Sequence, residues 1–238
     1  MLFKLKESFP AYYRYYGRRI AKRLSPSLST VFENSYKKFS IDQNILDIIS
    51  NKIESKIYIL NKNFKKHIVE IGFGDGDHLV AQSITNKDTH YIGCEVFVNG
   101  LGKVLKKIID LKLDNIKICG LNCLYLLSSL EDSSIDQIFI INPDPWEKKR
   151  HFKRRLINKD FISLLYKKIK NGGKIMITTD SLSYYCHMTE VLKNKEIEFE
   201  KIEKYSLKPG DKLYDISKYQ KKGINKGREI HLVELSKI

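Results

Sequence analysis

A glycine-rich turn lies where the first apolar strand of the sequence passes into a helix. It reads Glu-Ile-Gly-Phe-Gly-Asp-Gly from Glu70, with glycines at Gly72, Gly74 and Gly76. Glycine lets the backbone of such a turn pass close to a ligand, because a Cβ would collide with it. The dinucleotide pattern GxGxxG needs a further glycine where this chain has Asp77, and no Gly-Lys-Ser/Thr of a P-loop follows. Because the Glu70 carboxylate would also repel a pyrophosphate, the turn favours a cationic cofactor.

Two further polar residues mark the ends of the next two predicted strands. Glu95 ends the strand over residues 91–95, and Asn122 follows the strand over residues 116–119. A carboxylate at the end of a second strand can accept hydrogen bonds from both ribose hydroxyls of a nucleoside, and an amide can pair with an adenine. Since the carboxyl ends of parallel strands meet at one edge of a sheet, we expect Glu70, Glu95 and Asn122 to line one cofactor site.

The fourth predicted strand, over residues 135–141, ends in Asn142-Pro-Asp-Pro-Trp146. The two prolines fix φ and stiffen this turn, so Asp144 is presented at the edge of the sheet where substrates meet cofactors. Six basic residues follow within a short stretch, more than an ordinary solvated helix face carries, and they predict a phosphate-binding edge beside the site. They are Lys148, Lys149, Arg150, Lys153, Arg154 and Arg155.

The elements that must position these residues alternate between strands and helices. Strands are expected over 67–72, 91–95, 116–119, 135–141 and 174–179, and helices from Asp77, over 98–112, 124–130, 153–170 and 182–194. Ser40 is expected to cap an earlier helix, and Gly172-Gly173 to end the basic helix over 153–170. Alternating segments over 196–206 and 229–235 predict a C-terminal antiparallel strand pair. The pattern predicts an α/β protein with a doubly wound, mostly parallel sheet.

The chain has 238 residues and a formal net charge of +15, which is unevenly placed. Residues 1–40 carry nine basic and two acidic residues, whereas residues 41–146 carry 11 basic and 14 acidic residues. We expect residues 1–40 to form a basic N-terminal arm, partly disordered in the free protein, with Arg18 and Arg19 as phosphate contacts. Residues 41–238 are expected to form a single domain. Basic ends around a slightly acidic middle predict a polyanionic partner.

Composition excludes several classes of protein. Hydrophobic residues make up 42% and aromatic residues 11% of the chain, which excludes a disordered protein. No window approaches the length of about 18 apolar residues that a membrane span needs, and the N-terminus lacks a secretory h-region. The four cysteines show no CxxC spacing and the six histidines are scattered. We therefore expect a cytoplasmic protein with reduced cysteines and no structural metal.

Taken together, these motifs resemble the bacterial tRNA (guanine-N7-)-methyltransferases, a family of class I methyltransferases. The resemblance runs from about Tyr16 to Leu235. It rests on the glycine-rich turn with Asp77-His-Leu79, on Gly93-Cys-Glu-Val96, on Pro143-Asp-Pro-Trp146, on Lys148-Lys-Arg-His151 with Lys153-Arg-Arg-Leu156, and on Thr179-Asp180. It implies a Rossmann-like fold, S-adenosyl-L-methionine as cofactor and S-adenosyl-L-homocysteine as product. It also implies tRNA as partner, with methylation of N7 of a variable-loop guanosine (guanosine 46), no metal, no obligatory protein partner, and a monomer or homodimer.

The resemblance also implies roles for individual residues. The cofactor-contacting positions are Glu70, Gly72, Gly74, Gly76, Glu95, Asn122 and Asp144, and Asp144 is also catalytic. The substrate-binding positions are Lys148, Asp180, Ser217, Lys218, Tyr219 and Gln220. This chain departs from the family at three of its positions. Asn122 stands where an Asp is usual, and Gln220 stands where a Glu is usual. Lys222 stands where an Arg is usual, so the bidentate geometry of arginine is lost there. Ser217 keeps the hydroxyl of the usual Thr.

Two other functions stay open from the sequence. The run from Asn142 to Trp146 is faintly similar to the Asn-Pro-Pro-Tyr motif of methyltransferases that act on exocyclic base amines, although Asp144 separates the prolines. A non-catalytic tRNA-binding protein with a decayed cofactor site is the second alternative. The intact Glu70, glycines and Glu95 argue against it.

Overall fold

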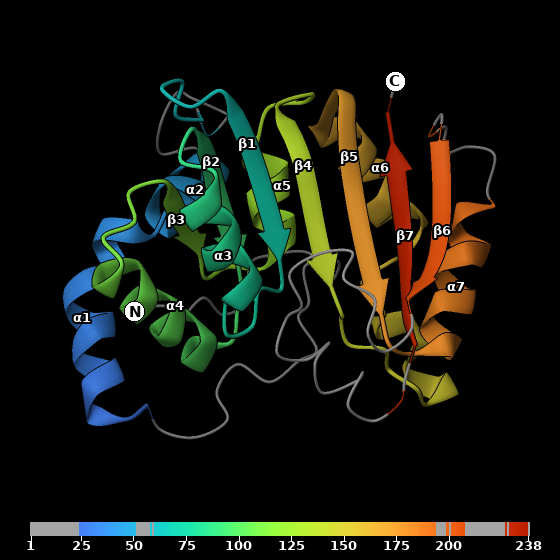
Figure 1. Cartoon of the computed structure of the whole chain (residues 1–238), viewed down its shortest axis with the longest axis horizontal. Coiled ribbons are helices and arrows are strands. Elements are labelled where there is room, and N and C mark those ends of the chain that lie inside the picture. Colours follow the sequence, from blue (N-terminus) through green and yellow to red (C-terminus); the bar gives the residue numbers. More distant parts are fainter. Residues whose placement is uncertain are drawn as a thin grey trace.

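Seven strands form one sheet at the centre of the structure (Figure 1). The computed structural model describes residues 24–50, 58, 60–193, 199, 201–207, 227 and 229–237. The strands are β1 (Lys66–Ile71), β2 (Thr89–Cys94), β3 (Ile116–Cys119), β4 (Ile135–Ile141), β5 (Ile169–Thr179), β6 (Lys201–Leu207) and β7 (Ile230–Ser236). Their order is β3-β2-β1-β4-β5-β7-β6, with β1 to β5 parallel and β7 antiparallel to both neighbours. The predicted mostly parallel sheet with a C-terminal antiparallel pair is confirmed.

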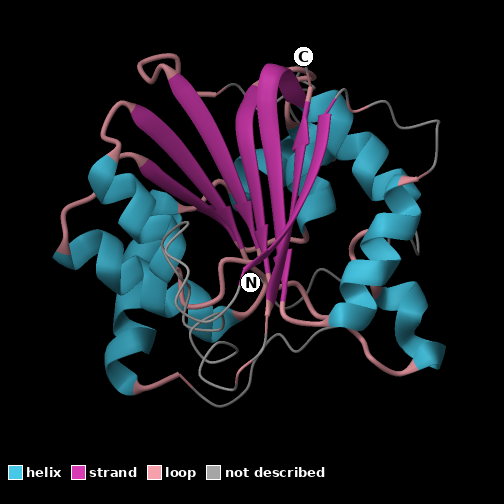
Figure 2. Ribbon diagram, turned by 45° about the vertical axis from the view of Figure 1, so that its right-hand side comes forward, coloured by secondary structure: helices cyan, strands magenta, loops and turns pink. Residues whose placement is uncertain are grey.

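Helices cover both faces of this sheet, as Figure 2 shows. One face packs against α1 (Pro26–Phe39), α3 (Asp77–Thr85) and α4 (Val98–Asp110). The other packs against α2 (Asp42–Ile49), α5 (Cys123–Ser129), α6 (Lys159–Lys168) and α7 (Leu182–Leu192). Two apolar cores therefore enclose the strands, which explains why β2 is buried along its whole length. None of the described helices has the length and hydropathy that would let it cross a membrane.

The strand order reverses between β1 and β4, since the chain runs outward from β1 to β3 and then returns to β4. In doubly wound sheets, ligands bind outside the carboxyl ends of the strands at this point of reversal. The carboxyl ends of β1, β4 and β5 lie together at the lower edge in Figure 1. The fold thus selects one edge for a functional site.

The N-terminal segment differs from the predicted arm. Residues 26–39 form α1, which lies against α4, and Leu28 comes within about 4 Å of the position that a Cβ on Gly102 would take. Ser25 begins the helix, because its Oγ accepts a hydrogen bond from the Leu28 N–H and Pro26 follows at the first helical position. Residues 26–39 therefore belong to the folded part of the chain, and Arg18 and Arg19 lie outside the described residues.

Ser40 does not cap α2, contrary to the prediction. It ends α1, and α2 begins after Ile41 without a side-chain cap. The Ser40 Oγ instead accepts a hydrogen bond from the Asp42 N–H at 3.0 Å, which closes the short turn between the two helices.

The helix predicted over residues 153–170 is present but shorter than expected. Lys153 and Arg154 belong instead to a 3-10 helix, η3 (Lys149–Arg154), and α6 begins only after Asn158, whose Oδ1 accepts from the Phe161 N–H at 3.0 Å. Adjacent like charges provide no apolar stripe, whereas Asn158 caps the first segment that has one. Gly172 and Gly173 lie inside β5 and do not end the helix.

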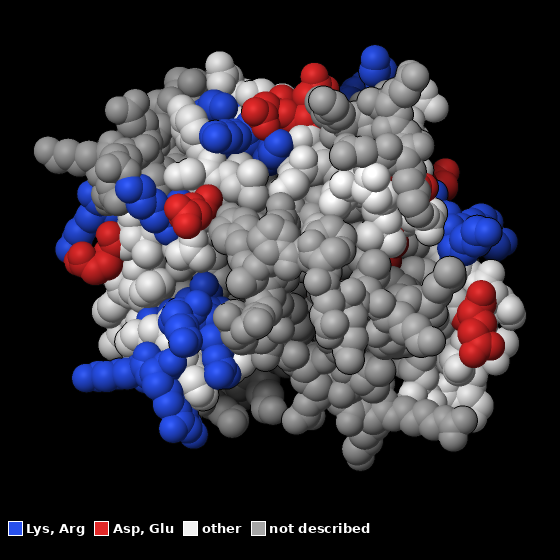
Figure 3. Space-filling view, turned by 180° about the vertical axis from the view of Figure 1, so that it is seen from behind, with Lys and Arg blue, Asp and Glu red and all other residues white. Residues whose placement is uncertain are grey.

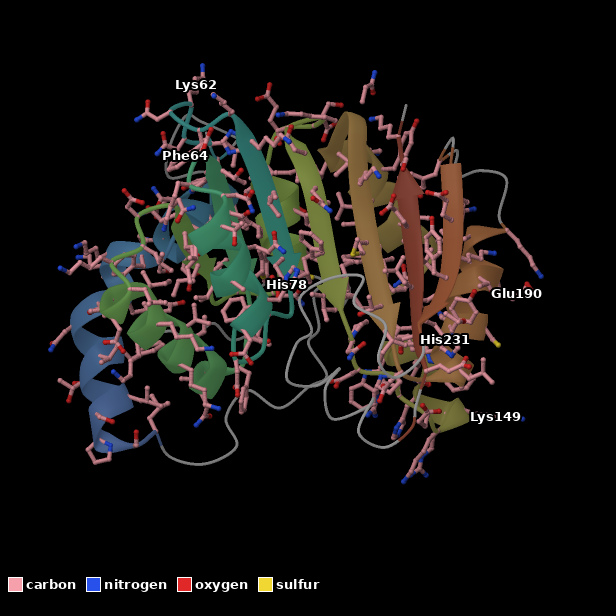
Figure 4. The ribbon with its side chains drawn as sticks, in the orientation of Figure 1. Lys62, Phe64, His78, Lys149, Glu190 and His231 are labelled. Carbon is pink, nitrogen blue, oxygen red and sulfur yellow. The ribbon has the colours of Figure 1, made fainter. Side chains whose placement is uncertain are left out.

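Two histidines face each other at the amino ends of β1 and β2, remote from the edge where β1 and β4 end. His67 pairs with His90 in the strand register, their rings lie 5.6 Å apart, and Phe64, labelled in Figure 4, stacks on His90. The Nδ1 atoms of both histidines are buried without a hydrogen-bond partner in the described part of the chain. His90 is only 2% exposed. Burial, followed by the charges of His67 and Lys117, lowers the pKa of His90 to about 4.

This pair predicts a loss of stability in mild acid. Because the pKa of His90 is lower in the folded protein than its unfolded value of about 6.5, the neutral side chain stabilises the fold fully above pH 6.5. That contribution, roughly 3 kcal/mol, is lost as the pH falls from 6.5 through about 4. Urea unfolding at pH 7 and pH 4.5 measures it. His90→Phe should lose less stability over this interval than the wild type. An unchanged pH dependence in His90→Phe would rule out this role for His90.

Candidate active site

The glycine-rich turn follows the end of β1, and its backbone is left-handed at all three glycines. Gly72, Gly74 and Gly76 have φ values of 76°, 56° and 73°, a region that side chains disfavour. Gly76 also begins α3, and a Cβ there would lie 2.0 Å from Val104 of α4. A Cβ on Gly72 would meet no described atom within 4 Å. The turn therefore presents bare backbone at the edge where the strand order reverses.

Glu95 binds this turn from the end of β2. Its Oε2 accepts from the Gly74 N–H at 2.9 Å, and its Oε1 accepts from the Phe97 N–H at 2.9 Å. Burial raises the pKa of Glu95, these backbone donors oppose the rise, and the charge of Asp144 adds to it. Glu95 directly follows β2 and Asp144 follows β4, so both carboxylates lie beyond the carboxyl ends of parallel strands.

Gly100 is a structural requirement of this site that the sequence reasoning missed. It lies in the first turn of α4, and a Cβ there would lie 2.2 Å from the Gly74 carbonyl oxygen and 3.6 Å from the Glu95 Cγ. A glycine inside a helix weakens that helix, so a glycine in the predicted helix over 98–112 indicates a position where close packing excludes a side chain. This signal could have identified Gly100 from the sequence.

Glu70 lies near the carboxyl end of β1, and its carboxylate is buried. Its side chain is 3% exposed, and its Oε2 lies 2.8 Å from the His78 Nδ1 on α3. Figure 4 shows His78 near the carboxyl end of β1. One oxygen of the Glu70 carboxylate therefore joins β1 to α3, and the contact of Glu70 with a cofactor stays a prediction.

Asn122 reaches the same edge from the end of β3. It begins α5, where its Oδ1 accepts from the Leu124 N–H at 3.0 Å. The preceding Gly120 donates its N–H to the Asp42 Oδ1 at 2.8 Å, and the other oxygen of Asp42 accepts from the Tyr36 hydroxyl. Residues of α1 and α2 thereby fix the segment that carries Asn122.

Asp144 lies in the motif loop, which we define as residues 142–148 after β4. Asn142 and Trp146 have φ values of 48° and 44°, so two non-glycine residues adopt left-handed backbone around Asp144. The Asn142 Oδ1 accepts from the Thr178 hydroxyl of β5 at 3.1 Å, which ties the start of the loop to the sheet. The Asp144 side chain reaches solvent, yet surrounding atoms desolvate it partly and raise its pKa. Strained backbone next to a carboxylate is typical of a functional site.

The end of β5 adds Asp180 to this edge. Asp180 is half-buried and directly precedes Ser181, which caps α7. The Ser181 Oγ donates to the Glu147 Oε1 of the motif loop at 2.5 Å. The predicted catalytic residue Asp144 and the predicted substrate residue Asp180 therefore lie on connected segments.

A basic cluster flanks the motif loop, as Figure 3 shows at the lower left of its view. Its exposed members are Lys148, Lys149, Arg150 and Lys153. Arg154 is half-buried and lies over the Trp146 ring, with its Cζ 5.1 Å from the ring centroid. Figure 4 shows Lys149 at the edge where β4 and β5 end. A concentration of positive charge thus borders the candidate site.

Arg155 does not belong to this exposed cluster, contrary to the prediction. It is 3% exposed, and its guanidinium donates hydrogen bonds to the Pro145 carbonyl and to Ser183. A phosphate cannot reach a guanidinium that is buried in this way.

The remaining predicted substrate residues, Ser217, Lys218, Tyr219 and Gln220, lie outside the described residues, as do Arg18 and Arg19. Within the described ranges, no group of three or more histidine, cysteine, aspartate or glutamate side chains is arranged to bind a metal ion.

Comparison with known proteins defines the class. A family model described as a putative methyltransferase matches residues 65–233. An antibiotic-related methyltransferase of known structure aligns with a TM-score of 0.55 at 18% identity, covering 76% of this chain and 98% of that one. The precorrin-6y C5,15-methyltransferase of Geobacter metallireducens aligns with a TM-score of 0.52 at 14% identity, covering 84% and 92%. At such identities the likeness shows the fold alone, which is the Rossmann-like methyltransferase fold.

Closer relatives define the family. The bifunctional methyltransferase of Rickettsia typhi is 34% identical over 216 residues, and this chain spans only 39% of its length. The tRNA (guanine-N(7)-)-methyltransferase of Zymomonas mobilis is 34% identical over 165 residues, which cover 68% of this chain and 70% of that protein. The protein of that name in Wolbachia pipientis is 31% identical over 216 residues, covering 91% and 89%. This chain belongs to the tRNA (guanine-N(7)-)-methyltransferase family.

Proposed function

We propose that the protein transfers a methyl group from S-adenosyl-L-methionine to N7 of a guanosine in tRNA. The names of the Zymomonas and Wolbachia relatives support this reaction. The observation that carries the proposal is the placement of two carboxylates at the edge where the strand order reverses, with Glu95 bound to the glycine turn and Asp144 in the strained motif loop.

The residues at the turn fit the cofactor. Bare glycine backbone allows close approach of a ligand, the Glu95 carboxylate suits ribose hydroxyls, and Asn122 suits an adenine. S-adenosyl-L-methionine supplies a methyl group that its sulfonium has already activated. Negative charge from Glu95 and Asp144 favours a ligand that carries this positive charge.

The target atom determines what the protein must do. Guanine N7 has an in-plane lone pair and no proton, so its methylation needs no strong general base. The chain has to orient the base and exclude water, and such orientation can contribute about 7–11 kcal/mol. The partly desolvated Asp144 suits this task better than an acid–base pair would.

Asp144 orients the guanine in our proposal. Its oxygens accept hydrogen bonds from the N1–H and the N2 amine, two donors that adenine does not offer on that edge. A well-formed bidentate pair of this kind discriminates between bases by roughly 1–3 kcal/mol. The desolvation that raises the pKa of Asp144 also strengthens its hydrogen bonds. Asp180, on the adjoining segment, shares this role or binds the ribose.

The partner is tRNA in the cytoplasm, and the target is a variable-loop guanosine such as guanosine 46. Lys148, Lys149, Arg150 and Lys153 are exposed beside the motif loop and supply phosphate contacts. Arg18, Arg19 and the segment from Ser217 to Gln220 complete the RNA contacts in this proposal. The target base has to leave its stack to reach Asp144, at a cost of a few kcal/mol.

Incubation of the protein with unmodified tRNA transcript and methyl-labelled S-adenosyl-L-methionine tests the proposal. We expect label in 7-methylguanosine on nucleoside analysis, and borohydride–aniline cleavage at one variable-loop guanosine. Label in an N2- or N6-methylated nucleoside would identify an exocyclic-amine methyltransferase instead. If no label is transferred and calorimetry detects no cofactor binding, the protein is a non-catalytic RNA-binding module.

A further inference from the structure

Arg155 connects two segments of the candidate site from inside the protein. Its Nε donates to the Pro145 carbonyl at 2.8 Å, in the motif loop directly after Asp144. Its Nη2 donates to the Ser183 Oγ at 2.9 Å, and its Nη1 donates to the Ser183 carbonyl at 3.3 Å. Three donors of one planar guanidinium thus bind residues on two segments that the sequence separates widely.

The surroundings of Arg155 fix its orientation. The Cζ atom lies 3.7 Å from the ring centroid of Phe152 in η3 and 5.0 Å from that of Tyr184 in α7. Such cation–π contacts favour arginine over lysine. Burial lowers the pKa of Arg155, while Tyr184 and Glu147 oppose this shift. The side chain is therefore a built part of the fold.

A second connection runs parallel to the first. Glu147, at the far end of the motif loop, accepts a hydrogen bond from the Ser181 hydroxyl. Ser181 and Ser183 both begin α7, and Ser181 directly follows Asp180. The start of α7 and the motif loop are consequently joined at two points on either side of Trp146.

From these contacts we propose that Arg155 is a positioning residue that sets the placement of Asp144 relative to Asp180. The motif loop contains two left-handed non-glycine residues, Asn142 and Trp146, so its backbone has to be held by contacts outside itself. Arg155 supplies the contact next to the strained Trp146. This inference rests on the proposed function, because it assigns Arg155 to the same methyl transfer.

The proposal differs from a phosphate-binding role in what a substitution should change. An arginine that contacts a phosphate contributes about 0.9 to the slope of log affinity against log salt, and its removal lowers that slope. A positioning arginine leaves the slope unchanged and affects the rate. Lys149→Ala and Lys153→Ala, both at exposed members of the basic cluster, are the matched comparison and should lower the slope.

The experiment measures single-turnover methylation of tRNA, tRNA affinity at several salt concentrations and cofactor affinity for each variant. Arg155→Lys should reduce the rate at saturating tRNA and cofactor by about tenfold or more, because a small misplacement of reacting groups has effects of this order. Its salt slope and cofactor dissociation constant should equal those of the wild type. The compact ammonium of lysine cannot reach the three acceptors that the planar guanidinium binds, so keeping the positive charge should not restore the rate.

Ser183→Ala is a second variant for the same test, needed because a substitution at the buried Arg155 can unfold the protein. Ser183 is exposed and the substitution removes one acceptor only. Because one donor of the buried guanidinium loses its side-chain acceptor, we expect a slightly lower melting temperature and a smaller fall in the rate, about threefold, with the same salt slope. A lower salt slope in Arg155→Lys, or full rates in both variants beside an active wild type, would overturn the inference. A wild type that does not methylate tRNA would overturn the proposed function and this inference with it.

Discussion

Asp144→Asn is expected to reduce the rate of tRNA methylation by about 100-fold or more at saturating tRNA and cofactor. The amide has nearly the shape of the carboxylate, but it presents an NH₂ group to donors on the guanine. It also removes the negative charge that interacts with Glu95 at this site. The base would then bind without the orientation that its N7 requires.

Binding of tRNA should survive this substitution, because phosphate contacts dominate the affinity of proteins for nucleic acids. Single-turnover kinetics and filter binding measure the two quantities separately. Asp88→Asn is the control, since Asp88 lies before β2, at the opposite edge of the sheet, where it pairs with Lys65. A rate for Asp144→Asn within a few-fold of the wild type would remove Asp144 from the catalytic centre.

Gly100→Ala is expected to weaken cofactor binding by about tenfold or more, since overpacking typically costs 1–3 kcal/mol. The new Cβ would lie 2.2 Å from the Gly74 carbonyl oxygen, which is backbone and cannot rotate away as a side chain would. Relief requires the glycine turn to shift away from α4. That shift breaks the hydrogen bond between the Gly74 N–H and Glu95, on which the proposed ribose contact depends.

Gly102→Ala provides the matched control on the same helix. The atoms nearest to a Cβ on Gly102 would belong to the Leu24 and Leu28 side chains, at 3.7 Å, which is an ordinary van der Waals contact. Replacing a glycine inside a helix by alanine typically stabilises it by up to about 1 kcal/mol. We therefore expect Gly102→Ala to bind the cofactor normally and to melt at a slightly higher temperature. Calorimetric titration of both variants would contradict this account of Gly100 if their cofactor affinities were equal.

The sheet was predictable because each parallel strand is a short apolar run followed by a turn residue. The runs before Gly72 and Asn142 end where β1 and β4 end, within a residue. The helix α1 was not predicted, because its mean apolar character is low and its packing against α4 is a long-range contact. The start of this helix was visible in the sequence as Ser25 followed by Pro26. This pair predicts a helix, and here it is a better guide than the basic composition, which predicts a disordered arm.

The candidate site was predicted in its outline and not in its internal connections. Glu95, Asn122 and Asp144 each follow a parallel strand. Their place at one edge of the sheet was therefore predictable, because parallel strands all end at the same edge. The buried partners of Glu70 and Arg155 depend on how α3 and α7 pack, which no local pattern encodes. Arg155 has the same residue type as its neighbour Arg154, and only the tertiary structure distinguishes the buried arginine from the one in the basic cluster.

Methylation of a tRNA transcript made with 7-deazaguanosine tests the central claim most directly. In this base a C–H group replaces N7, whereas N1, N2 and the sugar are unchanged. We predict that the ordinary transcript accepts one methyl group per molecule at a variable-loop guanosine. The 7-deaza transcript should bind with similar affinity and accept no methyl group. Methyl transfer to the 7-deaza transcript would contradict N7 as the target and would assign the reaction to another atom of the base.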